Sequence, residues 1–220
     1  TGKGVRVAVL DTGADLTHPD LKDRVGATKS FIPGQEVADR GGHGTHVTST
    51  VGGSGAASDG KEKGVAPGAD LAVGKVLSDE GFGSESEIIA GMEWAAAQGA
   101  DVVNLSLGGP DAIGVDALEE AVNRISADKG VLIAAAAGNK GSPGAVDSPG
   151  SADAALSVGA VDGGDTLADF SNQGPRVGDG AVKPDVTAPG VDITAAAAPG
   201  SEIEQEVGQK PEGYLTISGT

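Results

Sequence analysis

The chain has 220 residues, which is long enough to bury one sizeable hydrophobic core, and no stretch has the composition of a linker. Its net charge of −17 argues against a nucleic-acid partner, because phosphate binding requires clustered lysines and arginines. The absence of cysteine excludes a disulfide framework and thiolate chemistry, and no stretch approaches the ~20 apolar residues of a membrane span. We therefore expect a single domain over residues 1–220 that binds neither nucleic acid nor membrane.

The first predicted element is a buried parallel strand at residues 5–10, an apolar run rich in valine. It ends in Asp11-Thr12-Gly13, and the carboxyl ends of parallel strands are where open α/β sheets hold their functional groups. Asp11 could instead be a turn residue or a helix cap. The same triplet occurs in aspartic proteases, which need two such carboxylates sharing one proton. No second triplet is present, so that function would require a homodimer.

The stretch Gly42-His43-Gly44-Thr45-His46-Val47 places an imidazole between two glycines, just before a helix predicted over residues 45–51. With an ordinary pKa of about 6.5, histidine is suited to accept and return a proton near neutral pH, and glycines are too small to shield the ring. A metal shared by His43 and His46 is the alternative, although no third ligand follows at a recognisable spacing. His18, in an earlier turn, is expected to be structural, and residues 22–42 are predicted to be irregular.

Strands and helices alternate through the rest of the chain. Strands are predicted at residues 70–77, 102–109, 131–139, 154–161, 186–188 and 214–217, and helices at 84–98 and 116–129. A capping box begins the first of these helices at Ser84 and Glu87. The alternation implies right-handed crossovers and a parallel sheet between helical layers, so the fold class is α/β. The carboxyl ends of the strands then bring Asp11, Gly108 and Asn139 to one edge.

Four segments together resemble the subtilisin family of serine proteases. They are Val9-Leu10-Asp11-Thr12-Gly13, His43-Gly44-Thr45-His46-Val47, Ser106-Leu107-Gly108-Gly109 and Ala136-Ala137-Gly138-Asn139. Residues 18–21, 64–67, 170–174 and 183–190 resemble the family too, so the likeness covers nearly the whole chain. It implies a three-layer fold with a mostly parallel sheet flanked by helices, and one peptidase domain that is incomplete at both ends.

The resemblance also implies a serine endopeptidase with an Asp-His-Ser triad. Asp11 would fix the tautomer of His43, His43 would act as general base and then acid, and Asn139 resembles the family's oxyanion donor. Two segments match those between which the family binds a peptide as an added strand: Gly81-Phe82-Gly83 and Ser106-Leu107-Gly108. Plain turn glycines are the alternative at positions 81, 83 and 108.

The sequence departs from the family at its end. Residues 217–220 resemble the approach to the nucleophile, and the family's next residue is the serine itself. Ser218 is expected to be a neighbour of the site and not the nucleophile. We therefore expect these 220 residues to be inactive alone, with the serine supplied just past Thr220 in the parent protein. The alternative is a pseudoprotease that binds peptides without cleaving them, although the presence of Asp11, His43 and Asn139 argues against it.

The expected partner is a polypeptide substrate, and no cofactor is required for catalysis. A structural calcium ion is left open: Asp20 resembles a ligand of the family's tight site, but the other ligands would come from an N-terminal segment outside this chain. The family also implies a secreted, extracellular monomer with a cleaved pro-region.

Overall fold

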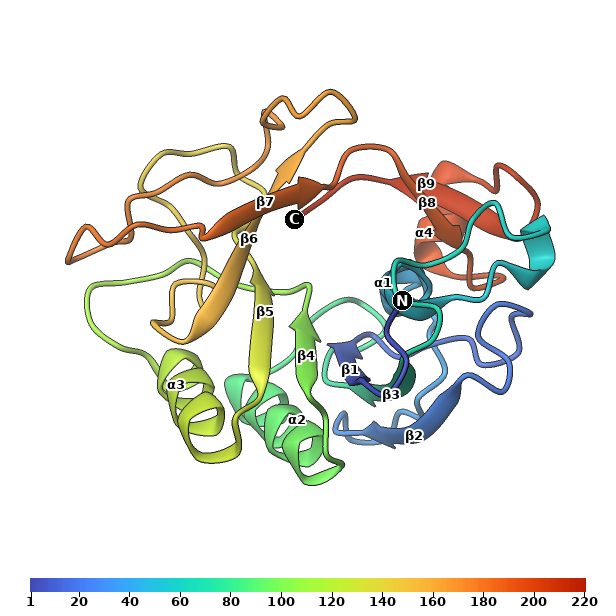
Figure 1. Cartoon of the computed structure of the whole chain (residues 1–220), viewed down its shortest axis with the longest axis horizontal. Coiled ribbons are helices and arrows are strands. Elements are labelled where there is room, and N and C mark those ends of the chain that lie inside the picture. Colours follow the sequence, from blue (N-terminus) through green and yellow to red (C-terminus); the bar gives the residue numbers. More distant parts are fainter. The chain divides into compact units, whose positions relative to one another are not determined.

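Strands and helices alternate along the chain, as Figure 1 shows for the computed structural model, which describes all 220 residues. The strands are β1 (Arg6–Asp11), β2 (Val25–Ser30), β3 (Asp70–Lys75), β4 (Val102–Leu105), β5 (Leu132–Ala136), β6 (Ala155–Val161), β7 (Val186–Pro189), β8 (Ile193–Ala196) and β9 (Tyr214–Ile217). The α-helices are α1 (His43–Gly52), α2 (Glu85–Ala97), α3 (Ala117–Lys129) and α4 (Glu202–Val207), and a 3₁₀ turn spans Ala56–Ser58. No helix combines the length and the apolar character needed to cross a membrane.

The chain divides into two compact units. The first comprises Thr1–Val103 and Thr194–Thr216, and the second comprises Asn104–Ile193 and Ile217–Thr220. The chain crosses from one unit to the other within β4, β8 and β9. The single domain expected over residues 1–220 stays a prediction.

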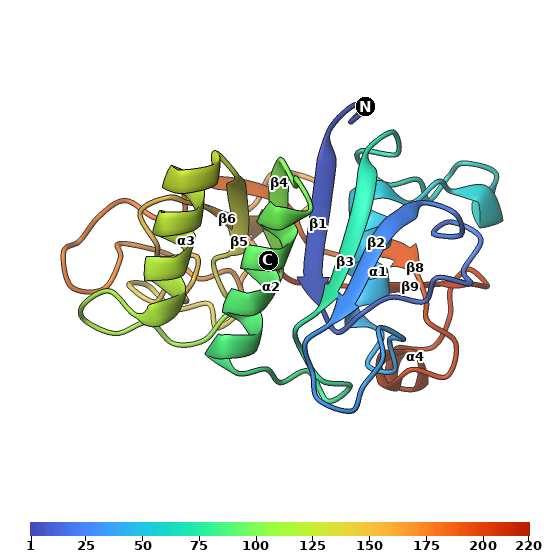
Figure 2. The same ribbon diagram turned by 90° about the horizontal axis from the view of Figure 1, so that it is seen from below.

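The first unit is built on a parallel sheet in which β3 lies between β2 and β1. The register of β1 and β3 runs from Arg6 opposite Asp70 to Asp11 opposite Lys75. Helices α1 and α2 both contact β1 and lie on opposite faces of the sheet (Figure 2). Residues 7–10 of β1 are therefore buried on both faces, which is why their sequence is uninterruptedly apolar. The α/β fold with helices flanking a mostly parallel sheet is confirmed.

Close packing of α2 depends on a glycine. A Cβ atom at Gly91 would lie 2.4 Å from Cγ1 of Val76, so no larger residue fits there without movement. The helix begins at the predicted capping box, in which Ser84 accepts from the N–H of Glu87 and the Glu87 side chain accepts from the N–H of Ser84. Trp94 of α2 packs edge-on against Phe31 with ring centroids 6.0 Å apart.

In the second unit β5, β6 and β7 are parallel neighbours, with Ile133 opposite Ala155 at the start of the first pair. Helix α3 packs on β5 and begins at a second capping box, formed by Asp116 and Glu119. Gly130 ends it in the left-handed conformation, at φ 69°.

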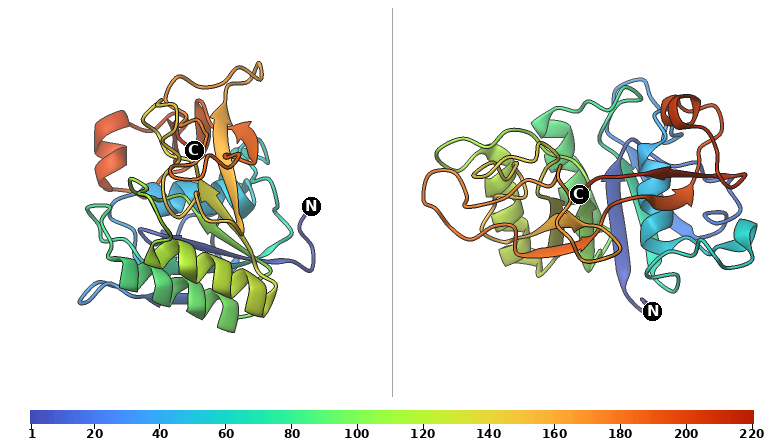
Figure 3. Two further views of the ribbon diagram at one scale, coloured as in Figure 1. Left: turned by 90° about the vertical axis from the view of Figure 1, so that its left-hand side faces the viewer. Right: turned by 90° about the horizontal axis from the view of Figure 1, so that it is seen from above.

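Parts of the predicted local structure were wrong, and two elements were missed. Residues 22–42 are not all irregular, because β2 pairs with β3 despite its polar sequence, with a bulge at Gly26. Three strands end earlier than predicted: β3 at Lys75 and not at residue 77, β4 at Leu105 and not at residue 109, and β5 at Ala136 and not at residue 139. α4 was missed because it has only six residues, with Ser201 as its N-cap. β8 was also missed; it pairs with β9 (Figure 3). The Ala196 N–H donates to Ser49 Oγ of α1 at 3.2 Å.

Candidate active site

Asp11 and His43 meet within the first unit, where β1 ends and α1 begins. Nδ1 of His43 lies 2.8 Å from Oδ1 of Asp11. The carboxylate is fully buried, whereas the imidazole side chain is 35% exposed. Because a carboxylate can only accept, Nδ1 carries the proton in this hydrogen bond and Nε2 is left as the proton acceptor of the neutral ring. This is the geometry of an oriented general base.

The pKa of His43 is raised to about 9. The main cause is the negative charge of Asp11, which favours the imidazolium, and the hydrogen bond from the ring to Asp11 acts in the same direction. Burial opposes the shift, while the charge of Asp39 adds a smaller increase. The pair therefore stabilises a protonated ring, as a base that must accept a proton requires.

The second oxygen of Asp11 has no hydrogen-bond partner. Oδ1 accepts from His43 and from the N–H of Thr12, the latter at 2.7 Å, whereas Oδ2 is buried and unpaired. The imidazole of His43 and the N–H of Thr12 are therefore the hydrogen-bond donors to this carboxylate, so its negative charge is little neutralised by other donors.

The glycines beside His43 are required by close packing. Gly42 has φ 98°, and a Cβ atom there would lie 2.5 Å from Oγ of Ser201. A Cβ atom at Gly44 would lie 2.1 Å from the carbonyl oxygen of Gly13. The sequence suggested that these glycines leave the ring open; the structure adds that they let the start of α1 approach the end of β1.

Asn139 lies within the second unit, exposed just beyond β5. Its Oδ1 accepts from both the N–H and the hydroxyl of Thr220, each at 2.9 Å. Gly138 precedes it with φ 104°, and a Cβ atom there would lie 2.2 Å from Nδ2 of Asn172. Since Thr220 occupies the carbonyl oxygen of the Asn139 side chain, the amide nitrogen is the group left to donate outward.

Ser218, in the same unit, is engaged elsewhere. Its hydroxyl accepts from the N–H of Asp192 at 2.9 Å.

The two predicted substrate segments belong to different units. In the first, Gly81 lies in a turn with φ 80°, Phe82 is 79% exposed, and a Cβ atom at Gly83 would lie 2.1 Å from the carbonyl oxygen of Val76. In the second, residues 106–108 follow β4 without strand pairing of their own, and Gly108 is exposed. A glycine is therefore required at position 81 by the positive φ of the turn, and at position 83 by the close approach of the Val76 carbonyl. Whether either segment binds a peptide stays a prediction.

Asp20 is buried and both its oxygens are hydrogen-bonded. Oδ1 accepts from the N–H of Ala57 at 2.9 Å, and Oδ2 accepts from the hydroxyl of Tyr214 at 2.8 Å. His18 adjoins this cluster: its Nδ1 accepts from the N–H of Asp20 and its Nε2 donates to the carbonyl of Gly213. Asp20 is thus held by protein donors, and a calcium ligand role stays a prediction.

A cluster of carboxylates that could hold a cation lies elsewhere, at Asp111, Asp116 and Glu119. Asp116 and Glu119 form the capping box of α3. The pKa of Asp111 is raised, mainly by burial and further by the charges of Glu119 and Asp116. The alternative of a metal shared by His43 and His46 fits poorly, since Nδ1 of His43 is occupied by Asp11 and His46 is buried.

Sequence analysis missed Asp39. This buried carboxylate lies three residues before the N-cap of α1, in a stretch that was predicted to be irregular. An acidic residue shortly before a helix that lacks its own capping side chain was the signal that could have found it.

The fold and the Asp11–His43 pair define an α/β protein with an acid–base pair at the carboxyl end of a parallel strand. The chain belongs to the Subtilase family, whose family model matches residues 2–220. The predicted resemblance is thereby confirmed.

Known proteins of this family match the whole chain. It is 39% identical over 247 residues to serine protease AprX of Bacillus subtilis (strain 168), covering 100% of this chain and 54% of AprX. It is 44% identical over 223 residues to subtilisin Savinase of Lederbergia lenta, covering 100% of this chain and 72% of Savinase. The crystal structure of a cold adapted subtilisin-like serine proteinase matches with a TM-score of 0.79 and 33% identity, over 99% of this chain and 70% of that one. The chain thus spans about half the length of AprX.

Proposed function

We propose that the full protein is a serine endopeptidase that hydrolyses polypeptides through an acyl-enzyme. The observation that carries the proposal is the 2.8 Å hydrogen bond between a buried Asp11 and a partly exposed His43. Membership of the Subtilase family and the identity of 39% to a serine protease support it.

In this mechanism the nucleophile is the hydroxyl of a serine that follows Thr220 in the full protein. Nε2 of His43 removes the hydroxyl proton as the serine oxygen attacks the peptide carbonyl. Asp11 holds the ring in the required tautomer and stabilises the imidazolium that forms. His43 then gives its proton to the amine that leaves when the peptide C–N bond breaks. Water, deprotonated by His43, releases the acyl group and restores the serine.

The amide nitrogen of Asn139 donates a hydrogen bond to the oxyanion of each tetrahedral intermediate. Its orientation by Thr220 supports this role, because a fixed donor stabilises developing charge without reorganising. No cofactor takes part in any step.

The substrate is an extended polypeptide, and the segments that would pair with its main chain are Gly81-Phe82-Gly83 in the first unit and Ser106-Leu107-Gly108 in the second. Exposure of Phe82 and the lack of strand partners at residues 106–108 support this assignment. We further propose a secreted monomer that matures by loss of a pro-region, as its family suggests.

The test uses the full-length protein and a fluorophosphonate probe, which reacts with an activated serine. We expect labelling and release of fluorescent peptide fragments, both lost in His43→Ala and strongly reduced in Asp11→Asn. Ser218→Ala is the matched control, since Ser218 is bonded to Asp192 and should be dispensable for both signals. A folded full-length protein that neither labels nor cleaves would overturn the endopeptidase and leave the peptide-binding pseudoprotease, which predicts peptide binding without turnover.

A further inference from the structure

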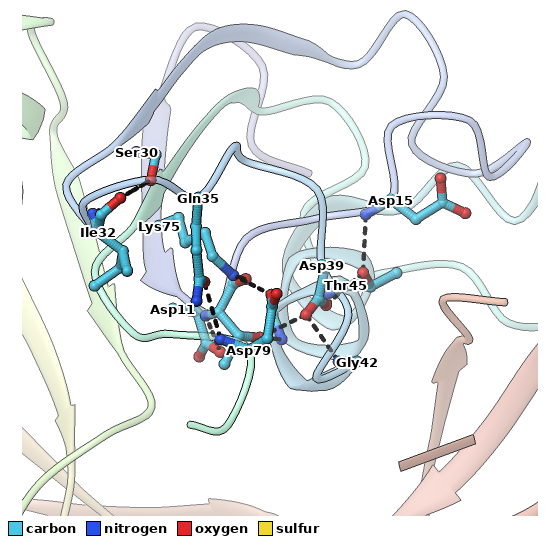
Figure 4. A network of polar contacts seen from close by, with 12 residues as sticks. Asp11, Asp15, Ser30, Ile32, Gln35, Asp39, Gly42, Thr45, Lys75 and Asp79 are labelled. Carbon is cyan, nitrogen blue, oxygen red and sulfur yellow. Dashed lines mark hydrogen bonds and ion pairs between the residues drawn. The ribbon is translucent and has the colours of Figure 1, made fainter. Parts of the chain in front are cut away.

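Asp39 is a buried carboxylate that binds the start of α1 from outside the helix. Its side chain is almost fully buried, and it accepts four hydrogen bonds from three residues. Oδ1 accepts from the hydroxyl of Thr12 and the N–H of Gly42, both at 2.8 Å. Oδ2 accepts from the N–H and the hydroxyl of Thr45, at 2.7 and 2.6 Å. Figure 4 shows Asp39 directed at Gly42 and Thr45.

These bonds substitute for a missing helix cap. Gly42 is the N-cap of α1 and has no side chain, and the first turn of the helix contains no acidic residue. Asp39 accepts the N–H of Thr45, the third residue of the helix, which is the bond a capping side chain normally makes. Its negative charge also faces the positive end of the helix dipole. His43 is the first residue of this helix.

Thr12 connects Asp39 to the residue that pairs with His43. Its N–H donates to Oδ1 of Asp11 at 2.7 Å and its hydroxyl donates to Asp39. The same hydroxyl oxygen accepts the N–H of Gly44 at 2.8 Å. The two peptide groups next to His43 in sequence, those of Gly42 and Gly44, are therefore both tied to the Asp39–Thr12 pair.

A buried lysine holds the other end of Thr12. Nζ of Lys75 is fully buried and donates to the carbonyl of Thr12 and to Oδ1 of Asp79, the latter at 2.8 Å. The charged side chains near His43 in this network are thus Asp11 and Asp39, with the Lys75–Asp79 ion pair on the far side of Thr12. The charge of Asp39 also raises the pKa of His43, although less than the charge of Asp11 and the hydrogen bond to Asp11 do; burial acts in the opposite direction.

We propose that Asp39 is a positioning residue that clamps the backbone on both sides of His43 to Thr12, and thereby fixes the hydrogen bond between Asp11 and the imidazole. Its consequence for turnover rests on the proposed endopeptidase function; its consequence for the imidazole does not.

The test compares Asp39→Asn with wild type in the full-length protein. Asparagine keeps the volume of the side chain but replaces one carboxylate oxygen with an NH2 group, which cannot accept a hydrogen bond. It therefore loses the N–H bond from either Gly42 or Thr45, whichever faces the NH2 group. The imidazole of His43 is followed by NMR as the pH is raised. We expect the pKa of His43 to fall below the wild-type value of about 9 and the Nδ1 proton signal to broaden. Turnover should fall roughly ten- to a hundredfold with KM nearly unchanged, because a small misplacement of a catalytic group acts on the chemical step.

Asp15→Asn is the control for loss of a negative charge. Asp15 also adjoins Thr45, but its carboxylate bonds only to Thr17 at the surface. It should leave the titration of His43 and the turnover at wild-type values.

Thr45→Val against Thr45→Ser provides a second measurement if Asp39→Asn does not fold. Valine removes one hydroxyl bond to Asp39, whereas serine keeps it, so only the valine variant should shift the titration of His43. Wild-type titration and turnover in folded Asp39→Asn, or identical titrations in the two Thr45 variants, would overturn the proposal. A shifted titration in a protein that has no hydrolytic activity at all would support the positioning role while contradicting the endopeptidase.

Discussion

The imidazole of His43 and the carboxylate of Asp11 are 2.8 Å apart, although one side chain is 35% exposed and the other is fully buried. A buried charge on one side and solvent access on the other give the ring a fixed proton at Nδ1 and a reachable acceptor at Nε2. This pair determines how both hydrolysis and stability should depend on pH.

Hydrolysis should increase as the pH rises from 7 to beyond 9. The pKa of His43 is raised to about 9, chiefly by Asp11, so only about 1% of the free enzyme has the neutral ring at pH 7. The dependence of kcat/KM on pH in the full-length protein measures this directly. Asp11→Asn should move the midpoint down towards the ordinary value of 6.5. A profile that is already flat at pH 7 would contradict the assignment.

The contribution of His43 to stability should decrease as the pH rises, whereas hydrolysis increases. A pKa that is higher in the folded state means that the pair stabilises the protein fully below pH 6.5, and that this stabilisation is lost as the pH rises through about 9. The difference in unfolding free energy between wild type and His43→Ala should therefore shrink between pH 6 and pH 10. Urea unfolding at both pH values checks it, and a constant difference would disagree with the raised pKa.

Gly44→Ala should destabilise the protein by about 1–3 kcal/mol, the usual cost of overpacking. Alanine is ordinarily favoured over glycine inside a helix by ~0.5–1 kcal/mol, but the added Cβ would lie 2.1 Å from the carbonyl oxygen of Gly13. Gly163→Ala is the control, because nothing lies within 4 Å of its Cβ position. Thermal unfolding that ranks the two variants equally would show that α1 relaxes away from β1.

Tyr214 should titrate with a pKa of about 12, mainly because burial disfavours the phenolate and secondarily because Asp20 is close; a hydrogen bond with Ser58 acts the other way. Tyr214 is the single tyrosine of the chain, so ultraviolet absorbance follows it without interference. Tyr214→Phe should cost about 1–3 kcal/mol, since Asp20 loses the donor to Oδ2. In the Asp20→Asn background the same substitution should cost less. A midpoint near 10 would mean that the phenol is not held as described.

Asn139→Ala should lower kcat with little change in KM, because the role we propose for its amide is to donate to charge that exists only along the reaction. The expected factor, roughly a hundred to a thousand, is the value known for subtilisin itself, a member of this family. Thr220→Ser keeps the hydroxyl that holds Oδ1 and should be nearly neutral. A rise in KM with kcat unchanged would instead indicate a role in binding the ground state.

The sequence was most informative where local chemistry and tertiary structure agree. The strand before Asp11 was predicted from its apolar run, the start of α2 from its capping box and the end of α3 from Gly130, because these signals are local in the sequence. The approach of His43 to Asp11 could be expected from the chemistry that requires both.

Asp39 and β2 could not be found in the same way. β2 has no alternation of apolar residues, and it becomes a strand only by pairing with β3, which is 40 or more residues away along the chain. The side chain of Asp39 turns inward because Thr12, Gly42 and Thr45 converge there, and no spacing in the sequence encodes that convergence.

The edge-on contact of Trp94 with Phe31 has a spectroscopic consequence. Trp94 is the single tryptophan, and it lies with Tyr214 in the unit that contains Asp11 and His43. Intrinsic fluorescence excited at the tryptophan band therefore reports on that unit alone. Any melting of the part that contains Asn139 is optically silent at this wavelength, and it must be followed by hydrogen exchange or circular dichroism.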